Sequence, residues 1–202
     1  MTLVEEIVVR RLGRLEYAAA LEAMRGFTAR RNEATADELW LLEHPPVYTL
    51  GQAAAAREVA NGIPVVRTDR GGDITYHGPG QVVLYALVDL ARRGIKVKRF
   101  VALLEQAVID LIGARGARRP GAPGVYVDGA KIAALGIRVR QGRAYHGLSL
   151  NVDMDLSPFS AIDPCGYPGL AVTQLRDLGL PETVESAGAK LARHLVDRIQ
   201  HA

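Results

Sequence analysis

The sequence predicts an α+β fold, a mixed and largely antiparallel sheet packed by helices. Strand-like apolar runs and amphipathic helical segments occur in mixed order along the 202 residues, without the strict alternation of a doubly wound fold. Residues 124–152 read as consecutive strands, and Asp128-Gly129 and Gln141-Gly142 supply the hairpin turns between them. No linker, low-complexity tract or fixed-period repeat interrupts the chain, so we expect a single domain over residues 1–202.

The first third of the chain is expected to contain two strands with one helix between them. Residues 4–9 (VEEIVV) read as a strand. Residues 14–31 place apolar side chains, among them Leu15 and Phe27, on one face of a helix. Residues 38–43 (ELWLLE) read as a short apolar strand, which ends at the following His-Pro-Pro.

The remaining elements follow from the same patterns. Residues 63–68 and 81–90 are apolar runs typical of strands. Residues 97–116 have strong helical periodicity and end at a glycine, and residues 182–200 close the chain as a further helix.

Composition excludes several classes of protein. The chain is 49% hydrophobic and 23% charged, which is typical of a soluble globular protein. A single cysteine excludes an intramolecular disulfide and favours a reducing cytoplasm. The N-terminus lacks the long apolar core of a signal peptide, and nowhere do 18 apolar residues run together to span a membrane.

The charge of the chain says little about its function. The formal net charge is +3, and only four of the 25 basic residues are lysines. The arginine excess reflects either genomic composition and thermal adaptation or attraction to acidic proteins and phosphate groups. Nucleic acid is not favoured as a partner, because the arginines are scattered and aromatic residues make up only 5% of the chain.

Residues 69–81 (DRGGDITYHGPGQ) stand out as a glycine-rich loop between two apolar strands. The loop carries the titratable residues Arg70, Asp73 and His77. Glycine allows a ligand to approach the backbone closely and leaves N–H donors accessible, so this segment is predicted to bind a ligand. It matches neither the phosphate-binding P-loop nor the dinucleotide-binding pattern.

Three further residues each have more than one interpretation. Lys131 follows a tight turn and enters an apolar run, so it is either the exposed end of the turn, which the residues favour, or an ammonium facing a pocket. His146 interrupts a strand beside Gly147 and is more often a structural histidine than a catalyst. Cys165 lies between Pro164 and Gly166, a loop setting unlike that of a buried cysteine. Cys165 is a nucleophile, a metal ligand or a residue that occurs there by accident.

A metal site is not predicted. The candidate ligands lack the short paired spacing of zinc motifs; they are His44, His77, His146 and Cys165.

The segments RGGDITYHGPGQ, KIAALGIRV, HGLSLNV and SPFSAIDPCG…VTQL occur in this order, after EHPPVYTLG at 43–51. Together they resemble the lipoyl(octanoyl) transferase family over roughly residues 35–176. The resemblance implies the fold of biotin and lipoate protein ligase catalytic domains. It also implies an acyltransferase that moves an octanoyl or lipoyl group from acyl carrier protein to a lysine of lipoyl-dependent proteins.

The resemblance also assigns residues to roles. It implies that Cys165 is the catalytic thiol and that Lys131 tunes it, which reverses the exposed reading of that lysine. Leu135 and Ser149 depart from the Ile and Ala that relatives commonly carry. The implied substrate-binding residues are Arg70, Gly71, Gly72, Asp73, Ile74, Thr75, Tyr76, His77, Ala134, Leu135, Gly136, Gly147, Leu148 and Ser149.

The implied chemistry passes through a thioester on Cys165 and requires no nucleotide, metal or other cofactor. An ammonium beside the thiol favours the thiolate, and backbone N–H groups of the glycine-rich loops are suited to stabilise the oxyanion. The implied donor is octanoyl-acyl carrier protein; the implied acceptors are lipoyl domains of 2-oxoacid dehydrogenase complexes and the H protein of glycine cleavage. We expect a cytoplasmic monomer. The alternatives are an ATP-dependent ligase on the same fold and a non-catalytic acyl-binding module.

Overall fold

The computed structural model of the protein describes residues 6–56, 59–163 and 169–202. Its principal helices are α1 Tyr17–Arg30, α2 Val97–Ile112 and α3 Val184–Gln200. Its strands are β1 Ile7–Arg14, β2 Asp37–Glu43, β3 Val47–Leu50, β4 Val65–Arg67, β5 Ile74–His77, β6 Gln81–Leu87, β7 Ala117–Arg118, β8 Gly124–Val127, β9 Ala130–Arg140 and β10 Arg143–Asn151.

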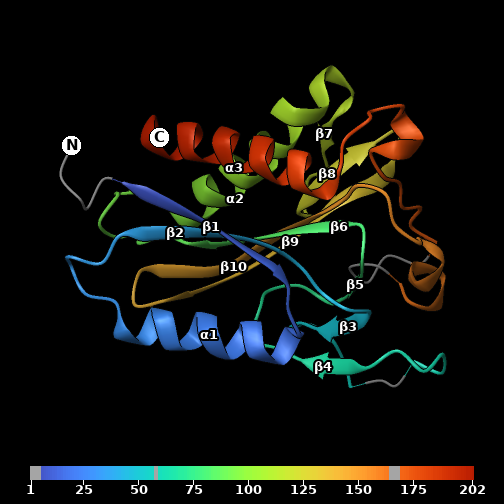
Figure 1. Cartoon of the computed structure of the whole chain (residues 1–202), viewed down its shortest axis with the longest axis horizontal. Coiled ribbons are helices and arrows are strands. Elements are labelled where there is room, and N and C mark those ends of the chain that lie inside the picture. Colours follow the sequence, from blue (N-terminus) through green and yellow to red (C-terminus); the bar gives the residue numbers. More distant parts are fainter. Residues whose placement is uncertain (1–5, 57–58, 164–168) are drawn as a thin grey trace.

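A seven-stranded sheet in the order β1-β2-β6-β10-β9-β8-β7 crosses the middle of the molecule (Figure 1). Only the β1–β2 pair in this sheet is parallel, and the other neighbouring strands are antiparallel. The mixed, largely antiparallel sheet with packed helices confirms the predicted α+β class.

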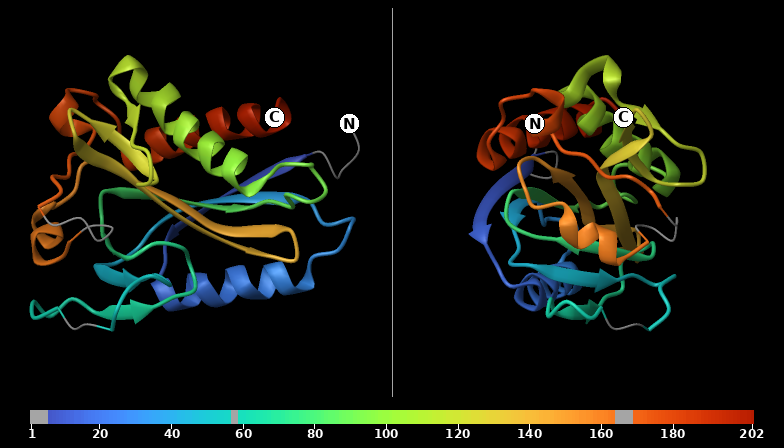
Figure 2. Two further views of the ribbon diagram at one scale, coloured as in Figure 1. Left: turned by 180° about the vertical axis from the view of Figure 1, so that it is seen from behind. Right: turned by 90° about the vertical axis from the view of Figure 1, so that its right-hand side faces the viewer.

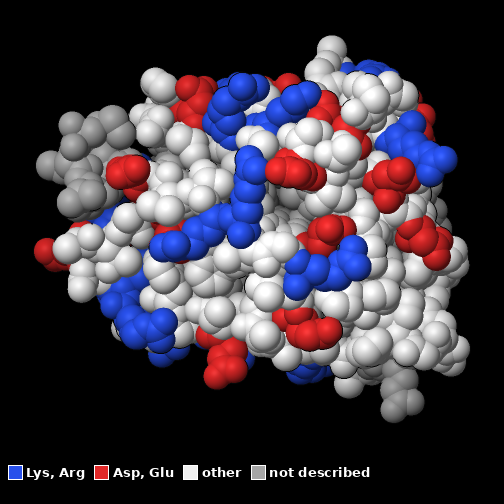
Figure 3. Space-filling model, in the orientation of Figure 1, with Lys and Arg blue, Asp and Glu red and all other residues white. Residues whose placement is uncertain are grey.

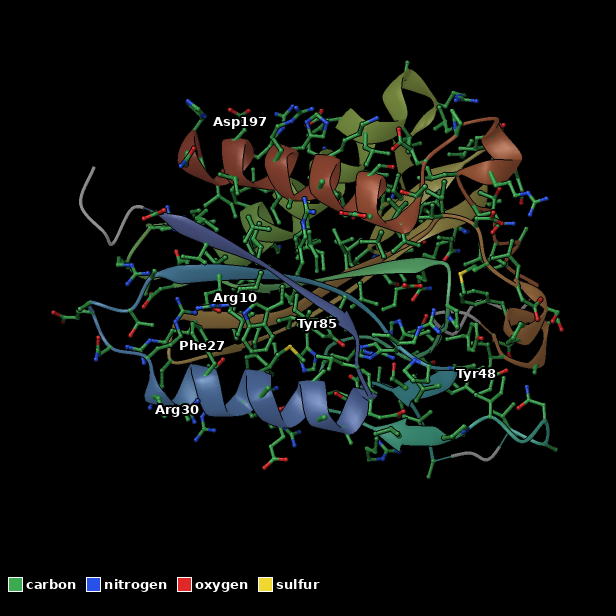
Figure 4. All side chains as sticks on the ribbon, viewed as in Figure 1. Arg10, Phe27, Arg30, Tyr48, Tyr85 and Asp197 are labelled. Atoms are coloured by element: carbon green, nitrogen blue, oxygen red, sulfur yellow. The ribbon has the colours of Figure 1, made fainter. Side chains whose placement is uncertain are left out.

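The sheet is covered on both faces, with α2 and α3 on one side and α1 on the other (Figure 2). Strand β6 shows why both faces need cover, because its side chains alternate between two cores. Val82 and Leu84 pack with α2 and α3, whereas Val83 and Tyr85 pack with α1. On the α1 side, Phe27 points toward the sheet and Arg30 away from it (Figure 4).

A second, three-stranded sheet in the order β4-β3-β5 lies beside α1, below one end of the main sheet (Figure 1). Its own apolar cluster contains Tyr48, Ile74, Tyr76 and Phe159. The rings of Tyr48 and Phe159 each lie 5.4 Å from the ring of Tyr76. This small sheet holds the glycine-rich segment against the main sheet.

Several predicted boundaries differ from the structure. The strand expected at 4–9 is observed as Ile7–Arg14, with residues 4 and 5 outside the described part of the chain. The helix expected at 14–31 begins only at Tyr17 because β1 continues to Arg14. The helix expected at 97–116 ends at Ile112, where Gly113 takes φ +75°.

The hairpins are confirmed. Asp128 and Gly129 have φ of +50° and +83°, and Gln141 and Gly142 have φ of +49° and +76°. Positive φ at both central residues is the type I′ geometry that antiparallel hairpins favour.

No helix within the described part of the chain combines the length and the hydrophobicity needed to cross a membrane.

Candidate functional site

The predicted loop at 69–81 contains a short strand, β5. Alternate side chains along this segment face either a cavity or the apolar cluster of the small sheet. Asp73, Thr75 and His77 line a cavity between the two sheets. Ile74 and Tyr76, which alternate with them, pack into the apolar cluster of the small sheet. The expectation of a loop over the whole segment is therefore wrong for Ile74–His77, and two of the predicted substrate-binding side chains point away from the cavity.

The other two predicted segments form the opposite wall of this cavity. Strands β9 and β10 pair Leu148 with Leu135 and Ser149 with Ala134. Gly147 pairs with Gly136, so the two triplets read separately in the sequence lie side by side. The cavity is lined by Tyr17, Arg70, Gly72, Asp73, Thr75, His77, Val83, Tyr85, Ala134, Leu135, Gly136, His146, Gly147, Leu148 and Ser149.

Two glycines in this wall are required by close approach of the backbone. A Cβ on Gly136 would lie 2.7 Å from the carbonyl oxygen of Gly71, and Gly71 N–H donates to the Ile137 carbonyl at 3.0 Å. A Cβ on Gly147 would lie 2.1 Å from the Leu84 carbonyl oxygen. Gly71 therefore holds the loop against β9 rather than lining the cavity.

Arg70 is buried and organises the loop from inside. Its guanidinium donates to the carbonyl oxygens of Thr49, Gly71 and Asp73 at 2.6, 2.9 and 2.7 Å. It also donates to the Thr49 hydroxyl at 2.9 Å. Carbonyl groups that curl around one guanidinium fix the loop conformation, so the observed role of Arg70 is to shape the cavity wall.

Two buried histidines are neutral: His77, which lines the cavity, and His44, whose ring lies 5.8 Å from that of His77. Burial lowers the pKa of His44 to about 4 and the pKa of His77 to about 3. His77 Nδ1 lies 2.7 Å from Gln81 Oε1, and the Gln81 amide nitrogen donates to the Asn151 side chain, so His77 Nδ1 carries the proton. The remaining nitrogen, Nε2, is an acceptor 3.5 Å from the Thr49 hydroxyl.

Hydrogen bonds also fix which nitrogen of His44 carries the proton. Its Nδ1 donates to the Leu15 carbonyl at 2.6 Å, and its Nε2 accepts from the Tyr85 hydroxyl at 2.7 Å. Tyr85 lies between the main sheet and α1 (Figure 4). The two histidine rings are therefore polar but carry no charge.

His146 adopts a strained backbone conformation, with φ +61°, and is buried. Its Nε2 donates to Asp69 Oδ1 at 2.8 Å, and the Tyr145 hydroxyl donates to Asp69 Oδ2 at 2.7 Å. Burial lowers the pKa of His146, and the hydrogen bond from His146 holds the pKa of Asp69 below its usual value. His146 therefore lines the cavity in a backbone conformation that residues with a side chain rarely adopt.

Lys131 lies on a second, smaller cavity and is only 3% exposed. The exposed-turn reading of this lysine is therefore wrong. Its Nζ donates to the Pro123 carbonyl at 3.3 Å and lies 5.2 Å from the centre of the Tyr126 ring. Thr75, Ala134 and Ser149 line both cavities, so the lysine lies directly behind the wall of the larger one.

Cys165 lies outside the described residues, but the chain on both sides of it is placed. Phe159 and Val172 both line the Lys131 cavity. Lys131 N–H donates to the Ala171 carbonyl at 2.8 Å, and Thr173 N–H donates to the Lys131 carbonyl at 3.0 Å.

Sequence reasoning missed four cavity residues: Tyr17, Val83, Tyr85 and, as part of the site, His146. The first three lie within an ordinary helix or strand pattern, and no local signal marks them. The positive φ of His146 leaves only one trace in the sequence, the neighbouring glycine. Among the described residues, no three His, Cys, Asp or Glu side chains gather as a metal site.

A family model described as the lipoyl protein ligase A/B catalytic domain matches residues 16–196. The octanoyltransferase of Thiobacillus denitrificans is 63% identical over 201 residues, covering 97% of this chain and 90% of that protein. The octanoyltransferase of Dechloromonas aromatica is 57% identical over 197 residues, covering 95% of this chain and 96% of that protein.

Solved structures show the same fold at low sequence identity. A crystal structure of lipoate-protein ligase A bound with ATP superposes with a TM-score of 0.77 at 16% identity, covering 96% of this chain and 85% of that one. A biotin protein ligase from Aquifex aeolicus, in complex with biotin and ATP, gives a TM-score of 0.58 at 10% identity, covering 96% and 70%.

Proposed function

Because the chain belongs to the lipoyl protein ligase A/B catalytic domain family and its relatives are octanoyltransferases, we propose that it transfers an octanoyl group in two steps. The group leaves an acyl carrier protein, forms a thioester with Cys165 and ends on the acceptor lysine of a lipoyl domain. The observation that carries this proposal is the buried Lys131 behind the wall of a cavity that includes apolar side chains.

The larger cavity suits an uncharged acyl chain. Val83, Leu135 and Leu148 provide apolar surface, and Gly136 and Gly147 keep the wall open between them. Burying an alkyl chain there is favourable by about 0.8 kcal/mol per methylene group. The neutral His44 and His77 add no charge that would oppose such a chain.

The flanks of Cys165 support placing its thiol near Lys131. Phe159 and Val172 lie on the Lys131 cavity, six residues before and seven residues after the cysteine. A free thiol is only slightly ionised at neutral pH, and a nearby ammonium favours the reactive thiolate.

In the first step, the Cys165 thiolate attacks the thioester carbonyl of the donor. The carbon–sulfur bond to the carrier's thiol breaks, and the leaving thiolate takes a proton from the Lys131 ammonium. Lys131 is then a neutral amine beside the octanoyl-enzyme.

In the second step, the acceptor amine attacks the Cys165 thioester. A carbon–nitrogen bond forms, the Cys165 thiolate leaves, and Lys131 accepts the proton that the amine releases. The thiolate and the ammonium are thereby restored. No nucleotide is consumed, because the donor is already an activated thioester.

We extend the proposal to partners and setting. The donor is octanoyl-acyl carrier protein, and the acceptors are lipoyl domains of 2-oxoacid dehydrogenase complexes and the glycine cleavage H protein. A nucleophilic thiol must stay reduced, which places the reaction in the cytoplasm. We also propose that the protein acts as a monomer.

The test is the intact mass of the protein after it is mixed with octanoyl carrier protein in nucleotide-free buffer. We expect one octanoyl adduct on the wild type, none on Cys165→Ser, and octanoylation of an added lipoyl domain by the wild type alone. An adduct that survives Cys165→Ser contradicts the thioester assignment. A strict requirement for ATP moves the protein to the ligase class.

A further inference from the structure

One peptide group connects Lys131 to a buried carboxylate on α2. The carbonyl of the peptide group between Pro123 and Gly124 accepts from Lys131 Nζ at 3.3 Å. The N–H of the same group belongs to Gly124 and donates to Glu105 Oε1 at 3.1 Å. Because a peptide group is planar and rigid, a bond that fixes its N–H also fixes the direction of its carbonyl.

Glu105 is an unusual residue for its place in the fold. It is 7% exposed on a helix whose buried face otherwise carries residues such as Phe100, Leu104 and Val108. Burial of a carboxylate costs free energy, and the ion pair with Arg118 at 3.2 Å offsets only part of it because the Arg118 side chain is 43% exposed. An apolar residue at 105 would serve packing better, so packing does not explain the carboxylate.

Gly124 makes the arrangement possible. Its φ of +146° lies in a region that residues with a side chain rarely adopt. A Cβ at this position would lie 2.7 Å from Lys131 Cε and 2.8 Å from the Ala133 carbonyl oxygen. Only glycine lets the peptide group pass this close to the lysine side chain.

We infer that Glu105 is a positioning residue for Lys131. Its carboxylate holds the peptide group so that the Pro123 carbonyl faces the ammonium, and a hydrogen bond to the N–H strengthens the carbonyl as an acceptor. Glu105 does not line either cavity and acts only through this peptide group. The inference rests on the proposed role of Lys131 in transfer, but the contact itself is measurable without that role.

The test compares Glu105→Gln, Glu105→Leu and Asp110→Asn. Glutamine keeps an acceptor for Gly124 N–H, whereas leucine removes it. Asp110 is the matched control, because it is an acidic residue of the same helix that pairs with Arg198 at 2.7 Å, on α3. We expect kcat for octanoyl transfer to fall about tenfold in Glu105→Leu and about threefold or less in Glu105→Gln, and to stay unchanged in Asp110→Asn.

A spectroscopic readout separates positioning from loss of stability. The chain has four lysines, so the ε-methylene NMR signals of lysine-labelled protein are few, and Lys131→Arg identifies the signal of Lys131. We expect this signal to move in Glu105→Leu and to keep its position in Asp110→Asn.

Two results overturn the inference: a folded Glu105→Leu protein with the wild-type Lys131 signal, or a Glu105→Gln protein that transfers as slowly as Glu105→Leu. If the wild type fails to transfer octanoate at all, the proposed function fails. The Lys131 signal still decides whether Glu105 positions the lysine.

Discussion

Buried polar groups occur at both ends of strand β2, and the two ends differ in how their charges are handled. At the first residue, Asp37 accepts hydrogen bonds from Arg31, Arg92 and Arg93. Asp89 and Arg143 complete this aspartate–arginine cluster with an ion pair at 3.3 Å. Every acidic group of the cluster has an arginine partner.

Beyond the last residue of β2, two buried histidines are uncharged, and one of them, His77, lies near the buried guanidinium of Arg70. His44 and His77 are neutral rings with one proton each in a fixed place; His77 lines the larger cavity, and the His44 ring lies 5.8 Å from the His77 ring. Lys131 is buried nearby and contacts a carbonyl group and an aromatic ring. At the first end the buried charges are paired as carboxylate and guanidinium, whereas at the second end the histidine rings are uncharged and their protons are fixed by hydrogen bonds.

The largest effect on stability is expected at the aspartate–arginine cluster. Asp37→Asn leaves buried guanidinium groups without their carboxylate, so the free energy of unfolding should fall by about 3 to 5 kcal/mol. Octanoyl transfer per folded molecule should not change, because the cluster lies at the other end of β2 from the cavity. Urea unfolding followed by a transfer assay on the folded fraction measures both. A loss below about 1 kcal/mol would show that the pairing is not needed for stability.

In the region of the two cavities, Lys131→Ala should leave the fold largely intact. It should slow both acyl loading and acyl transfer by about 100-fold. Lys131→Arg sharpens the comparison, because arginine keeps the positive charge but does not release its proton at neutral pH. We expect the arginine variant to retain part of the acyl loading and to transfer poorly. Rapid-quench measurement of the two steps separates them. Near-normal rates for Lys131→Ala would remove this lysine from the mechanism.

Because His44 and His77 are neutral in the fold, the free energy of unfolding should depend on pH. Burial lowers the pKa of His44 to about 4 and the pKa of His77 to about 3, whereas unfolded histidine titrates near 6.5. Between about pH 6.5 and about pH 4 the unfolded chain therefore binds more protons, and stability falls as the pH falls. Each histidine contributes a slope of up to about 1.4 kcal/mol per pH unit.

Urea unfolding at several pH values in this window measures the slope. His77→Gln cannot take up a proton, so its slope should be shallower than that of the wild type by about 1.4 kcal/mol per pH unit. Equal slopes for the two proteins would mean that His77 is not held neutral in the fold.

The sequence predicts the architecture well where elements are long and their pattern is local. The hairpins at 128–129 and 141–142 and the three long helices are found where glycine and apolar periodicity place them. Strands β3 and β5 were missed because each has only four residues and lies next to glycine or proline in the sequence. They exist because they pair with each other, as Tyr48 does with Tyr76. Such pairing depends on tertiary contacts that no local window contains.

The sequence predicted those parts of the site that carry a local pattern and missed those that depend on tertiary contacts. The glycine-containing segments led to the two opposing walls of the cavity, and the close approaches at Gly136 and Gly147 show why those positions are glycine. Residues within regular elements, such as Tyr17 and Tyr85, gave no signal because their side chains enter the cavity only through the packing of α1 on the sheet. The burial of Lys131 likewise depends on the segment around Val172, 41 residues later in the chain.

The smallest effect is expected for an ion pair outside both regions. Arg11 Nη1 lies 2.8 Å from Glu185 Oε1, with side chains 62% and 77% exposed. Water screens this pair, and two long side chains lose conformational freedom to form it, so Glu185→Gln should change the free energy of unfolding by less than about 0.5 kcal/mol. Figure 3 shows acidic and basic side chains interspersed over the face in view, where many contacts have this exposed character. Urea unfolding of Glu185→Gln beside Asp37→Asn tests whether burial, rather than the number of ion pairs, sets the stabilisation. A loss for Glu185→Gln as large as that for Asp37→Asn would show that burial does not set the stabilisation by an ion pair.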